Sequence, residues 1–216
     1  MSASAGESVR RQTGESENVL ARHPSLDEAF DPAVRIVEHD DAWARQADEE
    51  LRRIGEALGP LAVRLEHVGS TAVPGLAAKP ILDLQLCVAS MEPRAGYIGP
   101  LQRLGYLFAP DPESPDFHFF GKPPERPRTH HLHVCEAGSS HEFRHLAVRD
   151  FLRQHSDEAA RYAALKRELV KRHPQDRLAY IAGKEQYVTD LEGRAVVWAR
   201  RPLDRPGTPQ STRPGA

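Results

Sequence analysis

Apolar and polar side chains alternate most regularly in this chain between residues 81 and 88. In the segment ILDLQLCV, leucine stands at every second position, and Asp83 and Gln85 lie between the leucines. Successive side chains of a β-strand point to opposite faces of the sheet. The pattern therefore predicts a strand whose leucine face meets a helical layer and whose other face carries Asp83 and Gln85 toward a polar cleft.

Further elements surround this strand. Apolar residues separated by four, four, three and four positions from Trp43 to Leu58 fall on one stripe of a helix. This helix is predicted to begin after Asp40 or Asp41 and to end at Gly59. The same analysis predicts strands over 33–38, 61–68, 117–121 and 128–136, and helices over 94–104, 141–155, 157–173 and 176–198.

The order of these elements, with strands first and helices last, favours an α+β fold with a mixed sheet, helices on one face and a C-terminal helical segment. Residues 1–32 are polar and show no sustained hydrophobic period, which predicts a disordered leader. Residues 202–216 contain four prolines and almost no apolar residue, which predicts a disordered tail. One globular domain over 33–201 is expected between them.

Composition excludes several classes of function. The net charge of −2, with both signs mixed along the chain, argues against a nucleic-acid partner. No apolar run approaches the roughly 20 residues that span a bilayer, and the N-terminus lacks the apolar stretch of a signal peptide. We therefore expect no membrane partner and a cytoplasmic protein. Cys87 and Cys135 are too few for a disulfide framework and are interpreted as buried strand residues.

Basic residues comprise 24 arginines and only five lysines, a skew typical of a bacterial genome with high GC content. The skew makes the few lysines more informative than the many arginines. Lys79 lies in the turn just before the Asp83 strand, where a phosphate contact is a reasonable expectation.

The turn Gly69-Ser70-Thr71 directly follows a predicted strand and precedes the one with Asp83. Glycine lets backbone N–H groups approach an anion closely, and the two hydroxyls add further donors. Enzymes of the nucleotidyltransferase fold use this arrangement: the turn holds triphosphate oxygens and carboxylates hold Mg²⁺. Alternatively, Asp83 is a structural carboxylate that accepts hydrogen bonds from the turn.

A longer match is more specific. The segment EHVGSTAVPGLAAKPILD, residues 66–83, resembles the signature of the GrpB-like family, and similarity extends over about residues 34–198. It continues through LGY at 104–106, HLHV at 131–134 and RDFLR at 149–153. The resemblance implies a nucleotidyltransferase-like core followed by helices, a domain that also occurs fused to dephospho-CoA kinase.

The resemblance also implies a metal site on Asp83, for Mg²⁺ or Mn²⁺. Nucleotidyltransferases usually carry a second acid two residues further along the strand, and this chain has Gln85 there. A neutral amide can donate an oxygen to the metal but cannot offset its charge, which puts a two-metal mechanism in doubt. Glu66, at the end of the preceding strand, is the candidate that could compensate.

His131 and His133 alternate with apolar residues on the strand predicted over 128–136, which places them on the face that carries Asp83. Imidazoles in a cleft could ligate the metal or act as a general base near neutral pH. Both could equally be hydrogen-bonded structural residues. A zinc site built from this pair and a third ligand is a further alternative.

Other basic residues are candidates for phosphate contacts. His145, Arg149 and Arg153 are spaced by four and form a polar line on a helix, a pattern typical of a solvated face. The resemblance instead favours a phosphate contact for Arg149, held by an ion pair with its neighbour Asp150. It further places Lys166 and Lys184 at family positions, with an expected role at the substrate.

Two functions remain open. The first is a metal-dependent nucleotidyltransferase that moves a nucleoside monophosphate from a nucleoside triphosphate to an unidentified small-molecule or protein acceptor. The second is a non-catalytic module that binds a nucleotide or a coenzyme A precursor and serves folding or regulation. Gln85 favours the second, and the glycine turn, the histidines and the basic residues favour ligand binding in either case. Acceptor, nucleobase and oligomeric state are not encoded in any motif.

Overall fold

The computed structural model describes residues 33–110, 114–124 and 127–201. The leader predicted over 1–32 and the tail predicted over 202–216 lie outside these residues. A sheet of five strands forms the centre, in the order β1-β2-β5-β4-β3. Only the β2–β5 pair is parallel, so the sheet is mixed. The strands are β1 (Arg64–Val68), β2 (Leu82–Val88), β3 (Leu107–Phe108), β4 (Phe117–Lys122) and β5 (His130–Glu136).

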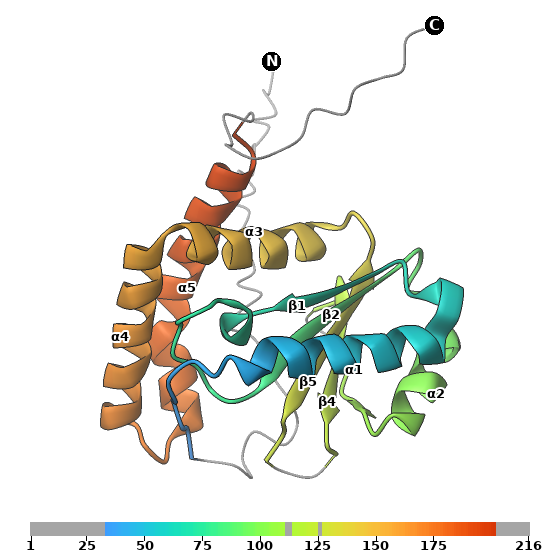
Figure 1. The fold of residues 1–216 in the computed structure, drawn as a ribbon, viewed down its shortest axis with the longest axis horizontal. Coiled ribbons are helices and arrows are strands. Elements are labelled where there is room, and N and C mark those ends of the chain that lie inside the picture. Colours follow the sequence, from blue (N-terminus) through green and yellow to red (C-terminus); the bar gives the residue numbers. More distant parts are fainter. Residues whose placement is uncertain (1–32, 111–113, 125–126, 202–216) are drawn as a thin grey trace, which may run out of the picture.

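Two helices, α1 (Ala42–Leu58) and α2 (Ala95–Arg103), cover one face of the sheet, with α1 in front of it in Figure 1. The predicted leucine face of β2 packs here: Leu84 and Leu86 are fully buried with Leu132 of β5. The apolar stripe of α1 meets them, as its spacing predicted. This packing leaves the other face of β2 for polar residues.

Three further helices, α3 (Ser140–Gln154), α4 (Ser156–Arg172) and α5 (Arg177–Ala199), close the structure. In Figure 1, α4 and α5 lie together beyond one end of the sheet, and α3 runs from them across it. Their apolar residues form a second core with the segment 73–77 that follows the 3₁₀ turn Ser70–Ala72. The turn is thereby enclosed between sheet and helices.

Several predicted bounds need correction. The strand predicted over 33–38 does not form, because Val37 makes a single antiparallel bridge with Ala78 and no ladder. The strand predicted from residue 61 begins at Arg64, since Gly59–Leu61 forms a 3₁₀ turn after α1. The short strand β3 was not predicted. It pairs with the end of β4 and completes the sheet.

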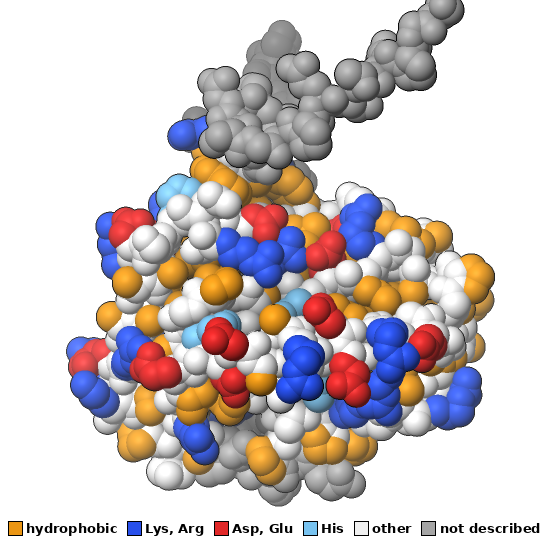
Figure 2. Space-filling view, viewed as in Figure 1, with side chains coloured by type: hydrophobic (Ala, Val, Ile, Leu, Met, Phe, Trp, Pro, Cys, Tyr) orange, Lys and Arg blue, Asp and Glu red, His pale blue; other side chains and the backbone are white. Residues whose placement is uncertain are grey.

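Acidic and basic side chains are intermingled on the face drawn in Figure 2, in line with the small net charge. Cys87 and Cys135 are both buried on adjacent strands, as predicted, with their sulfur atoms 3.9 Å apart. None of the helices that the structure describes is long and apolar enough to cross a membrane.

Candidate functional site

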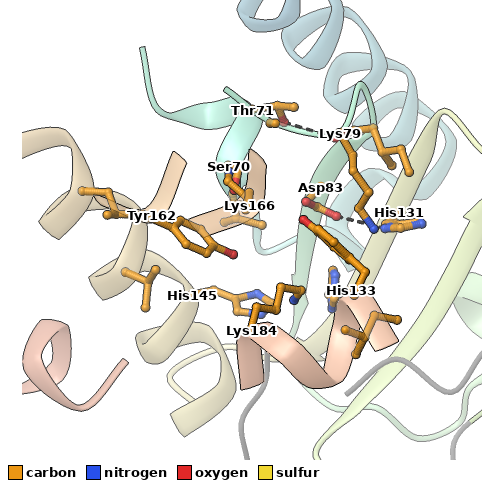
Figure 3. A pocket seen from close by; sticks show the side chains of 18 of the residues that line it. Ser70, Thr71, Lys79, Asp83, His131, His133, His145, Tyr162, Lys166 and Lys184 are labelled. Atoms are coloured by element: carbon orange, nitrogen blue, oxygen red, sulfur yellow. Dashed lines mark hydrogen bonds and ion pairs between the residues drawn. The ribbon is translucent and has the colours of Figure 1, made fainter. Parts of the chain in front are cut away.

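A cavity of about 110 Å³ lies between the polar face of β2 and β5, the turn after β1 and the three closing helices. Figure 3 shows Asp83 near its centre, between Ser70 and His131, with Lys166 and Lys184 entering from the helices. We call it the lysine-lined cavity. It brings together the predicted site residues Gly69, Ser70, Thr71, Lys79, Asp83, His131, His133, Lys166 and Lys184.

The close approach of Gly69 to Asp83 sets the shape of one cavity wall. Gly69 has φ 69° and ψ −168°, a conformation that is essentially restricted to glycine. A Cβ atom on Gly69 would lie only 2.5 Å from Oδ2 of Asp83. Two separate constraints therefore require glycine at position 69: the backbone conformation, and the carboxylate of Asp83 in the space that a Cβ atom would need.

Asp83 forms the central polar contact of the cavity. Its Oδ1 lies 3.1 Å from Nδ1 of His131, and its side chain remains 31% exposed, toward the cavity. Burial raises the pKa of Asp83, but the hydrogen bond from His131 and nearby positive charge, including Lys79, outweigh it and lower the pKa to about 2. Asp83 is thus a carboxylate at neutral pH, and a proton on Nδ1 of His131 faces it.

Three of the chain's five lysines line this cavity. Lys166 is only 3% exposed and its amine donates to Oγ of Ser70 at 3.1 Å. Burial, together with the like charges of Lys184 and Lys79, lowers the pKa of Lys166 to about 7. Arg177, 6% exposed, adds a fourth basic side chain. Cationic groups therefore outnumber the single lining carboxylate, that of Asp83.

The hydroxyls of the turn differ in their surroundings. Thr71 is 2% exposed, and its Oγ1 donates to the carbonyl oxygen of Ile81 at 3.3 Å and contacts Nε2 of His67 at 2.9 Å. This hydroxyl holds the turn against the start of β2. Ser70 is less buried, and its hydroxyl meets the amine of Lys166. Of the two, Ser70 is the one placed to contact a ligand.

Three other predicted residues, Gln85, Glu66 and Arg149, are not among the described residues that line the cavity. Gln85 is fully buried, and its Oε1 accepts a hydrogen bond from Nδ1 of His145 at 2.8 Å. Glu66 lies on β1, where its carboxylate pairs with Arg149 at 2.7 Å. The expectation that Glu66 and Gln85 join Asp83 at one metal is therefore not supported by their positions.

Arg149 secures α3 to the sheet. Besides pairing with Glu66, it donates to the carbonyl oxygen of His67 at 3.1 Å and to Asp150 at 2.8 Å. The ion pair with Asp150 was expected from the sequence. The polar line that includes Arg149 was also considered a solvated face. His145 and Arg149 are instead largely buried, whereas Arg153 is exposed, although its Nε donates to the carbonyl oxygen of Ala72 at 2.9 Å.

Several residues at this site were not predicted to lie there, although His145 was named as part of the polar line on α3. His145 lines the cavity from α3, and it stands four residues after His141, a spacing that often brings two imidazoles to one helix face. Arg177 and Tyr180 line it from α5. They precede Lys184 by seven and four positions, so a search for polar periodicity on that helix could have found them.

The fold and the site together define a small α+β protein with a nucleotidyltransferase-like sheet and one enclosed basic cavity. Residues 33–194 match the family described as GrpB protein, and the chain belongs to this family. UPF0157 protein PA4798 of Pseudomonas aeruginosa is 39% identical over 182 residues, which are 83% of this chain and 74% of that protein.

A solved structure confirms the fold. The crystal structure of conserved protein GrpB from Enterococcus faecalis has a TM-score of 0.73 and 31% sequence identity, and the match covers 77% of this chain and 100% of that one. Dephospho-CoA kinase of Mycolicibacterium paratuberculosis is 33% identical over 192 residues. That match covers 77% of this chain but only 47% of the kinase, so the chain spans about half of that relative.

Replacing Gly69 should disturb the site more than replacing an equivalent glycine. Gly69→Ala is expected to cost clearly more stability than Gly75→Ala, because both glycines have positive φ but only Gly69 faces Asp83. A side chain at a positive φ costs about 1–3 kcal/mol in backbone strain. Urea unfolding of the two variants beside the wild type measures the difference. Equal losses would show that the contact between Gly69 and Asp83 constrains nothing.

Lys166→Met should stabilise the protein in a pH-dependent way. The pKa of Lys166 is about 7 in the folded protein, and the ordinary lysine value is 10.5. Between these values the unfolded chain binds more protons, so wild-type stability rises with pH. Removing the amine should therefore raise the free energy of unfolding most at pH 6, by about 1–4 kcal/mol, and progressively less toward pH 10. Urea unfolding at pH 6 and pH 9 tests this, with the exposed Lys171→Met as control. A gain independent of pH would contradict it.

Proposed function

We propose that this protein binds the phosphate groups of a nucleotide in the lysine-lined cavity, together with one divalent cation, Mg²⁺ or Mn²⁺, on Asp83. The observation that carries the proposal is the convergence of Lys79, Lys166 and Lys184 on a cavity with a single lining carboxylate. Like charges held together in a low dielectric are costly, and an anion offsets that cost. Phosphate is the anion for which the glycine turn is also suited.

The donor set suits one cation and not two. Mg²⁺ is usually held in proteins by one or two carboxylates, with the remaining positions filled by water and substrate phosphates. Asp83 supplies one carboxylate, with Oδ1 near His131 and Oδ2 toward the Gly69 turn. A divalent cation bound there would bridge Asp83 to the phosphate oxygens and neutralise part of their charge.

The size of the cavity limits what enters it. Pockets for drug-sized ligands measure about 300–1,000 Å³, whereas this cavity has about 110 Å³. It admits phosphate groups, and the nucleoside must lie outside. The base would then contribute little selectivity, consistent with the lack of a base-reading motif in the sequence. A phosphorylated precursor of coenzyme A is a candidate of the same chemistry, since one relative of this chain is named dephospho-CoA kinase.

Nucleotide binding is expected to require Mg²⁺ and the lysines. In calorimetry, ATP should bind clearly more tightly with Mg²⁺ than with a chelator present. Ser70→Ala and Lys184→Ala should each lose about 1.5–3 kcal/mol, or roughly ten- to hundred-fold in affinity, as expected for one charge-assisted hydrogen bond.

The matched control is Lys171→Ala, which removes an exposed lysine from α4 and leaves the cavity intact. It should bind ATP as the wild type does. Equal affinities with and without Mg²⁺ would rule out the cation on Asp83. Equal affinities of Lys184→Ala and wild type would remove Lys184 from the phosphate site.

A second candidate function is transfer of a nucleoside monophosphate to a small-molecule or protein acceptor. The contact between Asp83 and His131 favours it, because a carboxylate that holds Nδ1–H leaves Nε2 of the same ring able to accept a proton. The acceptor oxygen would attack the α-phosphorus and its proton would pass to His131. The bond from that phosphorus to the bridging oxygen would break, and pyrophosphate would leave with the electron pair.

Transfer is tested by release of pyrophosphate from the four nucleoside triphosphates in the presence of a panel of small acceptors. Asp83→Asn should abolish turnover while keeping the fold, since the two side chains have nearly the same shape. His131→Gln should lower turnover by about 10²–10⁴-fold, the usual contribution of a general base, with ATP affinity changed much less. Turnover that survives Asp83→Asn would contradict this candidate, and binding without turnover across the panel would leave the binding module as the function.

A further inference from the structure

We infer that His133, His141 and His145 form a binding site for one transition-metal ion of the Zn²⁺ class, distinct from the cation proposed on Asp83. The three imidazoles are 2%, 0% and 3% exposed, and each offers a ring nitrogen within 4.8 Å of the others. None of the three has a role that the phosphate site requires. The inference is independent of the proposed function.

The backbone brings these rings together from two elements. His133 lies on β5, and His141 and His145 lie one turn apart on α3, in the spacing H-x₃-H that puts two imidazoles on one helix face. Their ring centroids are 4.4, 4.8 and 5.7 Å apart. Three nitrogens bound tetrahedrally to Zn²⁺ are about 3.3 Å apart. The ring nitrogens lie within 4.8 Å of one another, so side-chain rotations that bring them closer by about 1.5 Å would close this triangle.

The hydrogen bond from His145 to Gln85 orients one ligand for a metal. Nδ1 of His145 lies 2.8 Å from Oε1 of Gln85, and the amide nitrogen of Gln85 lies toward the sulfur of Cys87 at 3.7 Å. The amide oxygen accepts, so Nδ1 of His145 carries the proton and Nε2 carries a lone pair. Nε2 is buried and has no hydrogen-bond partner among the described residues. Metal-bound histidines are typically held in this way through the second ring nitrogen.

The ligand set selects the kind of ion. Imidazoles suit Zn²⁺, Cu²⁺, Ni²⁺ and Fe²⁺, whereas Mg²⁺ prefers oxygen. Three protein ligands leave one coordination position open. Because His133 and His145 both line the lysine-lined cavity, the ion would lie at its floor, with water or an anion in the fourth position.

The segment His141-Glu142-Phe143-Arg144-His145 has the form H-E-x-x-H, in which the glutamate of a metalloprotease acts as base. Glu142 does not have that freedom here. Its Oε1 pairs with Arg64, and its Oε2 accepts from the backbone N–H of Gly138 at 2.5 Å. The carboxylate thus anchors α3 to β1 and to the loop before the helix. The site holds a metal without the base that hydrolysis by such a motif would need.

The test is metal binding by the full-length protein. After removal of metals with a chelator, Zn²⁺ is titrated against a competing chromophoric chelator, and uptake of one equivalent per chain is expected. Co²⁺ should give the strong visible absorption of a tetrahedral site. His141→Gln should weaken Zn²⁺ by more than about 100-fold, since loss of an outer partner alone costs about 10–100-fold.

Two further comparisons make the test specific. Gln85→Leu should weaken Zn²⁺ by about 10–100-fold, and Gln85→Glu should restore it, because a carboxylate can also hold Nδ1–H of His145. His118→Gln is the matched control. This histidine lies on the neighbouring strand β4, where it contacts Tyr97 on the opposite face of the sheet, so its variant should bind Zn²⁺ as the wild type does.

The two cation sites can be separated. Asp83→Asn should keep one equivalent of Zn²⁺ while it loses Mg²⁺-dependent ATP binding, so failure of either proposal leaves the other standing. Wild-type protein that takes up no Zn²⁺ overturns the inference, as does His141→Gln that folds and binds Zn²⁺ with wild-type affinity. If His141→Gln does not fold, wild-type uptake and the Gln85 pair decide the question.

Discussion

The parallel pairing of β2 with β5 is the constraint on which the site depends. It sets Asp83 beside His131, Gln85 beside His133, and Leu84 beside Leu132. Neighbours in register share a face of the sheet, so burial of the leucines against α1 and α2 fixes the carboxylate and the imidazoles on the other side. A shift of either strand by one residue would exchange the two faces. The packing of the hydrophobic core therefore also fixes which polar groups of β2 and β5 lie side by side, and no further interaction is needed to set their register.

The charge arrangement around Asp83 is not one that folding alone would favour. At an effective dielectric constant of 20, two like charges about 6 Å apart repel by about 3 kcal/mol. The cavity nevertheless places three lysines and Arg177 around one carboxylate. The lowered pKa of Lys166, caused first by its burial and then by its neighbours Lys184 and Lys79, reflects this strain in the native protein. Strongly perturbed groups gathered in one cavity are typical of functional sites.

Features set by residues close together in the sequence could be predicted, whereas features set by contacts between distant segments could not. The alternation in residues 81–88 gave the strand and both of its faces, because a period of two is a local property. The strand expected over 33–38 failed, since its partner segment offers a single bridge at Ala78. Glu66 was expected at the metal, but its partner Arg149 lies 83 residues away in sequence, on a helix whose orientation no local pattern contains. The lysines of α4 and α5 came only from the family resemblance, for the same reason.

The role expected for Gln85 from its position on β2 differs from the role that its contacts in the fold indicate. Counted along β2, it stands where a second metal-binding acid is expected, and its amide looks like a lost ligand. In the fold its oxygen lies against His145 and not in the cavity. A carboxylate at this buried place would add a charge that the apo protein must solvate, whereas the neutral amide orients the imidazole without that cost. Gln85 therefore holds a histidine at the position where a second acid would hold a cation directly, which fits the single carboxylate that lines the cavity and the buried cluster of imidazoles beside it.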